Sequence, residues 1–257
     1  MDNLETTLTL IGGPTVLIEL NGVRLLTDPT FDPPGDYQGG VLLKKTAGPA
    51  LTTEQVGPVD AVLLSHDQHF DNLDHGGRAF LGNARTTFTT SAGATRLGAN
   101  SKSLQPFETA TMEGTGGGKL LVTGAPARHG PAGIEPMSGD VIGFLIGRRE
   151  PGDAIYVTGD TVWYAGTAEV AKRYRPKLII AFAGSAEPRG RFHMTMDAND
   201  VIEAAHAFPD ATVVGVHNHG WAHFVESAAD LASAFATLRI PDRLAALEAG
   251  KPTRFAV

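Results

Sequence analysis

The chain has 257 residues, of which 42% are hydrophobic and 19% charged, which is enough for a sizeable core and predicts one domain over residues 1–257. Its formal net charge is −7 without a basic cluster, which argues against a nucleic-acid partner. It has no cysteine, which excludes disulfides and thiolate metal sites, and no apolar run of the roughly 18 residues that a membrane span needs. Its first residues lack a signal-peptide pattern, so we expect a cytoplasmic protein.

The first half of the chain predicts a β-rich layer. Asn21-Gly22 between two apolar runs is typical of a hairpin turn. Residues 31–50 are rich in Gly and Pro and are expected to form a long loop. Residues 59–64 are nearly continuously apolar, as in a strand buried on both faces. The predicted strands are 4–11, 15–20, 23–27, 59–64 and 86–90, and the predicted helical segments are 52–56, 74–81 and 91–97.

The second half alternates strands with helices, which predicts α/β layers. The predicted strands are 119–123, 141–146, 154–158, 178–183 and 212–216. The predicted helices are 167–173, 196–208 with Thr195 or Asp197 as cap, 222–238 and 242–247. No repeat or linker divides the chain.

Histidine and aspartate follow several predicted strands directly. His66 and His69 follow residues 59–64, and Asp160 and His217 follow two strands of the second half. Strand ends meet at one rim of a layered α/β fold, so these side chains are expected to come together with His129.

Imidazole nitrogens and carboxylate oxygens together suit zinc, manganese or iron. One or two such ions, zinc foremost, would lower the pKa of bound water to about 7 and generate hydroxide. Asp160 is the natural bridging ligand, although Gly-Asp-Thr is also an ordinary turn sequence. A single histidine is usually only a surface or core residue, and His75 and His206 in predicted helices are interpreted in that way.

These segments resemble the metallo-β-lactamase fold superfamily over nearly the whole chain. The branch with ascorbate-6-phosphate lactonase and N-acylphosphatidylethanolamine-hydrolysing phospholipase is the most similar. The matching segments are residues 11–19 (IGGPTVLIE), 26–29 (LTDP), 64–71 (LSHDQHFD), 127–130 (ARHG), 158–161 (TGDT), and Val216-His217 before Trp221. The resemblance implies a four-layer αβ/βα sandwich with His66, His69, Asp71, His129, Asp160 and His217 as metal ligands.

The chain departs from the family in its metal motif. Read strictly from His66, Gln68 takes the second histidine position; read with one inserted residue, His69 and Asp71 fill the motif and Asn72 replaces its last histidine. We prefer the inserted alignment, in which the second metal position loses the motif imidazole. Asp74 is a candidate to assist there. The branch also often carries histidine in place of Gly13.

Other polar residues flank these segments. His193 is a candidate general acid, with a solvated loop residue as the equal alternative, and His219 or His223 could replace His217 as the last ligand. Arg128 could bind an anionic substrate group or form a structural salt bridge.

The sequence therefore predicts a metal-dependent hydrolase that uses metal-bound hydroxide on a small ester, lactone, amide or phosphodiester. Asp71, Asp160 and His193 are its predicted catalytic residues, its partner is a small-molecule substrate, and homo-oligomerisation stays open. The alternative is a non-catalytic metal- or ligand-binding module with a degenerate site. A di-iron redox protein is a third hypothesis. It is disfavoured because such members of the superfamily usually rely on a flavin-carrying domain, for which this chain has no room.

Overall fold

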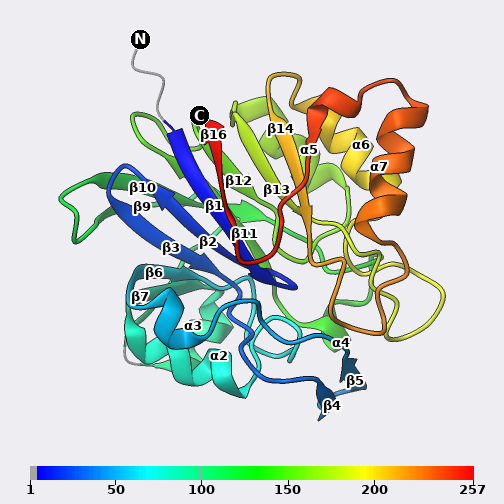
Figure 1. Cartoon of the computed structure of the whole chain (residues 1–257), viewed down its shortest axis with the longest axis horizontal. Helices are drawn as coiled ribbons and strands as arrows, with labels where there is room; N and C mark the ends of the chain where they lie inside the picture. Colours follow the sequence, from blue (N-terminus) through cyan, green and yellow to red (C-terminus); the bar gives the residue numbers. More distant parts are fainter. Residues whose placement is uncertain (1–4, 99) are drawn as a thin grey trace.

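The apolar strands assemble into two seven-stranded sheets and one separate hairpin in the computed structural model, which describes residues 5–98 and 100–257 (Figure 1). Residue 4, where the first predicted strand starts, lies outside the described residues. The first sheet has the order β16 (Pro252–Ala256), β1 (Glu5–Gly12), β2 (Thr15–Leu20), β3 (Val23–Thr27), β6 (Val59–Leu63), β7 (Ala84–Thr89) and β8 (Ser101–Ser103).

The second sheet runs from β15 to β9. Its order is β15 (Leu244–Ala245), β14 (Thr212–Val216), β13 (Leu178–Phe182), β12 (Ile155–Val157), β11 (Ile142–Gly147), β10 (Lys119–Pro126) and β9 (Thr109–Glu113). The separate hairpin pairs β4 (Gly35–Gln38) with β5 (Leu42–Lys45).

Helices lie chiefly on the outer faces of the two sheets. They are α1 (Thr53–Val56), α2 (His75–Phe80), α3 (Ser91–Leu97), α4 (Glu135–Ser138), α5 (Ala165–Arg173), α6 (Ala198–Ala207) and α7 (Ala228–Thr237), with short 3₁₀ turns at Leu81–Asn83 and Pro241–Arg243. One apolar cluster fills the space between the sheets, a second joins α5, α6 and α7 to the second sheet, and a third joins α1 and α2 to the first. This is the expected four-layer αβ/βα sandwich, and the expectation is confirmed.

Parallel strands bring the polar loops to one edge. β3, β6 and β7 run parallel in the first sheet, and β12, β13 and β14 run parallel in the second. β6 is buried along its whole length, as its nearly continuous apolar sequence predicts. The loops after β6, β12 and β14 therefore carry the histidines and aspartates into one region.

The structure corrects several predicted elements. Residues 31–50 contain the β4–β5 hairpin; most of its residues are exposed, so it lacks the apolar alternation that marks a strand. α7 begins at Ala228 because Ser227 and Asp230 form a capping box, whereas the amide of Ala222 donates to the Lys44 carbonyl outside any helix. A 3₁₀ turn and β15 replace the helix predicted at 242–247, and β8, β9 and β16 were not predicted.

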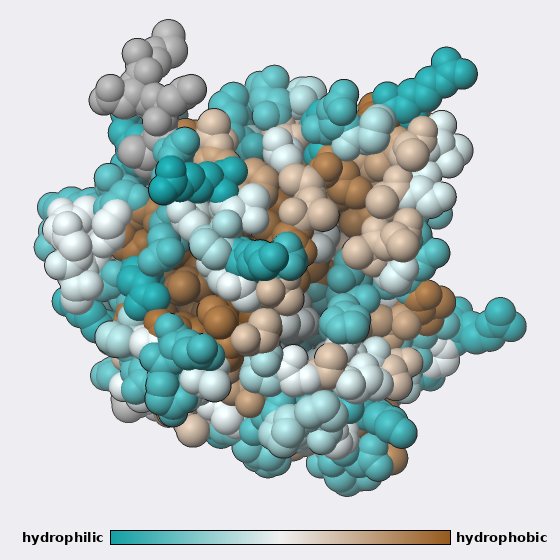
Figure 2. Space-filling model, in the orientation of Figure 1, coloured by the Kyte–Doolittle hydropathy of each residue, from teal (hydrophilic) through white to brown (hydrophobic). Residues whose placement is uncertain are grey.

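The surface is mixed in character. Figure 2 shows hydrophilic residues over much of one face, with hydrophobic colours gathered at the upper right, where Figure 1 draws β14 and α7. A groove of about 370 Å³ there is lined by apolar side chains that include Leu231, Phe235 and Leu247. Within residues 5–98 and 100–257, none of the helices has the length and apolarity of a membrane span.

Candidate metal centre

All the predicted metal ligands lie in two adjoining groups at the strand-end edge. Within each group, one ligand atom per residue lies within 4.8 Å of every other. The first group is His66, His69, His129 and Asp160, and the second is Asp71, Asp160 and His217. Asp160 belongs to both.

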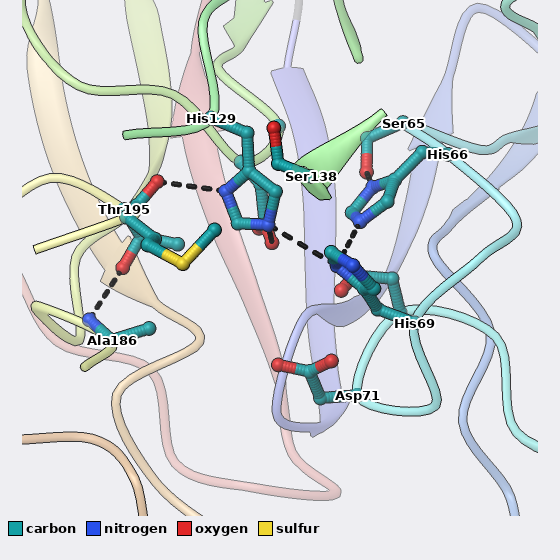
Figure 3. Close-up of polar contacts among 12 residues, drawn as sticks. Ser65, His66, His69, Asp71, His129, Ser138, Ala186 and Thr195 are labelled. Atoms are coloured by element: carbon teal, nitrogen blue, oxygen red, sulfur yellow. Dashed lines mark hydrogen bonds and ion pairs between the residues drawn. The ribbon is translucent and has the colours of Figure 1, made fainter. Parts of the chain in front are cut away.

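The first group is a tight cluster of imidazole nitrogens (Figure 3). His69 Nδ1 lies 2.8 Å from His66 Nε2 and 3.2 Å from His129 Nε2. His129 Nε2 is also 3.5 Å from Asp160 Oδ2. Three ring nitrogens and one carboxylate oxygen from loops far apart in the sequence thus face one point.

Hydrogen bonds on the far side of two rings fix which nitrogen carries the proton. The Ser65 hydroxyl donates to Asp28 Oδ2 over 2.6 Å, so it can only accept from His66 Nδ1, 2.9 Å away. His129 Nδ1 lies 2.8 Å from the Met194 carbonyl, which is an acceptor only. Both rings therefore direct an unprotonated Nε2 toward the group.

The second group uses the other oxygen of Asp160. His217 Nε2 lies 3.4 Å from Asp160 Oδ1 and 3.7 Å from Asp71 Oδ2. His223 Nε2 is 2.9 Å from Asp71 Oδ2. Because its two oxygens face different groups, Asp160 has the position of a bridging carboxylate.

The backbone at His217 is constrained to reach this position. Its φ is 55°, in the left-handed region that residues other than glycine rarely adopt. Its amide donates to the carbonyl of Gly13 over 2.9 Å, which ties the loop after β14 to the turn between β1 and β2. Backbone strain of this kind is common at functional sites.

Burial keeps the imidazoles neutral. It lowers the pKa of His66 well below the ordinary value, and the neighbouring rings of His69 and His129 lower it further. Burial also lowers the pKa of His129 and of His217 to about 3. Neutral imidazole is the form that binds a metal.

The two carboxylates behave differently. Burial raises the pKa of Asp160 well above the ordinary value, and the negative charges of Asp71 and Asp28 raise it further. Burial also acts to raise the pKa of Asp71, but the hydrogen bond from His223 and the electrostatic interactions with the rings of His223 and His217 outweigh it, so that this pKa is lowered. A cation between the carboxylates would favour the ionised form of both.

Unpaired polar atoms are concentrated at the second group. Asp71 Oδ1, Asp160 Oδ1 and both ring nitrogens of His217 are buried and find no hydrogen-bond partner within the described ranges. Buried polar atoms are rarely left unpaired, and each such atom needs an explanation. Coordination of a divalent cation would satisfy the carboxylate oxygens and one ring nitrogen, so the residues present fit such an ion.

The altered motif retains ligands for both groups. His69, and not the exposed Gln68, joins the first group, as in the inserted alignment. Asn72 is fully buried and donates from Nδ2 to Asp28 Oδ2 over 3.1 Å. With asparagine at the last motif position, the imidazole of the second group comes from His217.

Asp74 belongs to neither ligand group and bonds to other residues, so its expected role beside the metal is wrong. It forms a buried ion pair with Lys45, at 2.8 Å, and accepts hydrogen bonds from the amides of Phe31, Asp32 and Gly77, the last of which caps α2. Its function in the fold is therefore to join the β5 strand, the 31–32 segment and α2.

His193 lies outside both groups. Its Nε2 is 3.3 Å from Asp200 and its Nδ1 is 3.7 Å from Asp197 at the start of α6, and these two carboxylates raise its pKa. This placement lends no support to a role as general acid. His219 is exposed, and His223 contacts the second group only through Asp71.

The supporting contacts could not be read from the sequence. Asp28 follows β3 and accepts from both the amide and the hydroxyl of Ser65, which holds the start of the His66 loop. Asp28 lies in the LTDP segment that resembles the family, but no role in supporting the ligands was predicted for it. The Met194 carbonyl belongs to a loop far from His129 in the chain, and no sequence signal identifies it.

Two cavities border His129. The narrow one, with room of about 20 Å³, also contacts His69 and Asp71, and its other lining residues are Val41, Leu43, Ala186, Pro188, Arg189 and Met194. The larger one, of about 450 Å³, is lined by Arg128 and Tyr164 among others. The Arg128 guanidinium lies 4.7 Å from the Tyr164 ring centroid, and its Nε donates to the Gly130 carbonyl.

Comparisons with known proteins agree with this geometry. A family model described as the beta-lactamase superfamily domain matches residues 23–218. The UPF0173 protein YddR of Bacillus subtilis (strain 168) is 24% identical over 234 residues, which cover 87% of this chain and 90% of that protein. A stretch of 66 residues, 26% of this chain and 18% of the relative, is 33% identical to N-acyl-phosphatidylethanolamine-hydrolyzing phospholipase D 1 of Caenorhabditis elegans.

A solved structure shares the fold over the full length. The isothiocyanate hydrolase from Delia radicum gut bacteria superimposes with a TM-score of 0.83 at 21% identity, and the match covers 98% of this chain and 100% of that one. At this identity the likeness extends to the fold and not to the substrate.

Proposed function

This chain belongs to the β-lactamase superfamily, and from that premise we propose that it is a metal-dependent hydrolase. The observation that carries the proposal is Asp160, buried between two groups of ligands with one oxygen toward each. His66, His69, His129 and Asp160 would hold one divalent cation, and Asp71, Asp160 and His217 a second. Zinc is the first candidate, with manganese and iron as alternatives.

When bound, such cations supply Lewis acidity, which acidifies water and polarises a substrate oxygen. The protein's own contribution is orientation. Ser65 and the Met194 carbonyl hold the protons of His66 and His129 at Nδ1, which leaves each Nε2 free as a ligand. His223 donates from Nε2 to Asp71 Oδ2 and so orients this carboxylate, whose Oδ1 has no hydrogen-bond partner within the described ranges.

The narrow cavity, with room of about 20 Å³, admits only a small reacting group beside the ligands, and its lining is largely apolar. Val41, Leu43 and Met194 exclude water around the ligands, which strengthens electrostatic interactions inside the site. The proposed reaction is hydrolysis at a polarised carbon or phosphorus, as in a small ester, lactone, amide or phosphodiester. The similar structure bears the name of a hydrolase that acts on isothiocyanates, which also react at an electrophilic carbon. A single domain and a cytoplasmic location remain part of the proposal.

Metal content and turnover test the proposal together. Elemental analysis of the purified protein after zinc or manganese reconstitution should give one or two ions per chain. Esters, lactones, amides and phosphodiesters should be hydrolysed only by the loaded protein. His129→Ala should lose both metal and turnover, because it removes a ligand of the first group, whereas His206→Ala, at an exposed position in α6, should change neither.

Two results would contradict the proposal. Full turnover by His129→Ala would mean that the chemistry occurs elsewhere. Absence of metal after reconstitution would favour a non-catalytic binding module instead.

A further inference from the structure

Arg189 lies at the mouth of the metal centre. It lines the narrow cavity together with His69, Asp71 and His129. Its Nη2 lies beside the tip of the β4–β5 hairpin, where a Cβ added to Gly40 would be 3.2 Å from it.

The guanidinium has few partners of its own. Across residues 5–98 and 100–257, no carboxylate lies within ion-pair distance of Arg189, Asp71 included. Its hydrogen bond there is a long one, 3.4 Å from Nη2 to the carbonyl of Met137 in α4. Arginine has five N–H donors in a fork that matches an oxyanion, so most of its binding capacity is unused.

The net charge of the metal-loaded site bears on the role of the unused Arg189 donors. Two divalent cations bring four positive charges, and the carboxylates of Asp71 and Asp160 offset two of them. Arg189 thus adds positive charge to a centre that is already net positive, and it would weaken metal binding by repulsion. A cation in that position is useful to the protein only if an anion joins it.

We propose that Arg189 binds an anionic group of the substrate, so that the enzyme acts on small compounds bearing a carboxylate or phosphate-type oxyanion close to the scissile bond. The inference rests on the proposed metal-dependent hydrolysis and names its substrate class. Arg189 acts as a specificity-determining residue, since it discriminates anionic from neutral substrates of the same shape.

Phosphate binding to the zinc-loaded protein tests the proposal without knowledge of the substrate. Inorganic phosphate is titrated calorimetrically into the wild type and into Arg189→Met and Arg189→Lys, after zinc content has been measured for each. Arg189→Met should weaken phosphate binding roughly ten- to hundredfold, the usual effect of losing charge-assisted hydrogen bonds. Arg189→Lys should fall between, because lysine keeps the charge without the fork.

Two other arginines serve as matched comparisons. Arg191→Met removes an exposed positive charge two residues away and should leave phosphate affinity unchanged. Arg128→Met removes the arginine of the larger cavity and should also have little effect, because that guanidinium stacks on Tyr164 and bonds to Gly130.

The outcomes separate this inference from the proposed function. If Arg189→Met holds the full zinc content and binds phosphate as tightly as the wild type, the role of Arg189 is refuted and the hydrolase proposal stands. An equal loss in Arg191→Met, or a loss in Arg128→Met instead, also refutes it. If the wild-type protein takes up no zinc or manganese, the proposed function fails and this inference fails with it.

Discussion

At the residue scale, the candidate metal centre depends on side chains that are not themselves candidate ligands. The Ser65 hydroxyl accepts a hydrogen bond from His66 Nδ1 and donates one to Asp28. It therefore determines which ring nitrogen of His66 faces the first group. Residues in this supporting position commonly change metal affinity ten- to a hundredfold. That the candidate ligands lie together was predictable from their position after strands, whereas the partners of those residues come from loops that only the tertiary structure brings together.

Ser65→Ala tests this support. The change removes the acceptor for His66 Nδ1, so the ring can turn or adopt the other tautomer, and zinc affinity should fall by roughly tenfold or more. Competition with a chromophoric chelator measures the affinity, and circular dichroism checks that the fold is kept. Ser103→Ala, on the exposed strand β8, is the control and should bind zinc as the wild type does. Equal affinity in Ser65→Ala would contradict the assigned tautomer.

At the element scale, short segments are held by specific close contacts and not by their own propensity. The β4–β5 hairpin belongs to neither large sheet, and its base is anchored by Lys45, which pairs with Asp74 and lies 5.4 Å from the Trp221 ring centroid. A two-stranded hairpin is marginal alone, so this anchoring sustains it. A Gly- and Pro-rich sequence without alternation gave no sign of these strands.

Helix α2 packs directly on the chain after β3, and Gly77 makes that possible. A Cβ at Gly77 would overlap the carbonyl oxygen of Pro29. Gly77→Ala should therefore lower the free energy of unfolding by about 1–3 kcal/mol, as overpacking does. Helix propensity alone would predict a gain of about 1 kcal/mol, so the sign of the effect decides between the two.

Denaturant unfolding measures this effect. Gly82→Ala is the matched control, because no atom lies within 4 Å of a Cβ added there, and its stability should stay within about 0.5 kcal/mol of the wild type. A stabilised Gly77→Ala protein would mean that α2 does not pack against Pro29 as described.

At the scale of the whole molecule, the sequence predicted the layers and the site better than the loops. The family resemblance and the four-layer fold are confirmed, because long apolar strands and their order survive in the sequence pattern. The edge strands β8, β9 and β16 and the late start of α7 were missed. β16 pairs with β1 from the opposite end of the chain, β8 and β9 are short and mostly exposed strands without apolar alternation, and the start of α7 is set by a local capping box that the predicted helix ran past. His193 shows the same limit: its partners are the carboxylates of α6, which spacing in the sequence did not reveal.

The candidate metal ligands lie in loops that follow strands of both sheets. His66, His69 and Asp71 follow β6 of the first sheet, whereas His129, Asp160 and His217 follow strands of the second. Bound cations would therefore connect the two halves of the sandwich and relieve the unpaired atoms buried between them. Binding to the folded state alone stabilises a protein by about 4 kcal/mol when free metal exceeds its dissociation constant a thousandfold.

Chelation should accordingly lower the melting temperature by roughly 10 °C, at about 2–4 °C per kcal/mol for a chain of this size. Hydrogen exchange should quicken most in the loops that follow β6 and β14, because these carry ligands from opposite sheets. His129→Ala, which lacks a ligand of the first group, should show a much smaller response to the same chelator. If elemental analysis shows that the metal is gone while the melting temperature and exchange rates stay unchanged, the ions do not connect the sheets, and the centre must be held by the apolar core alone.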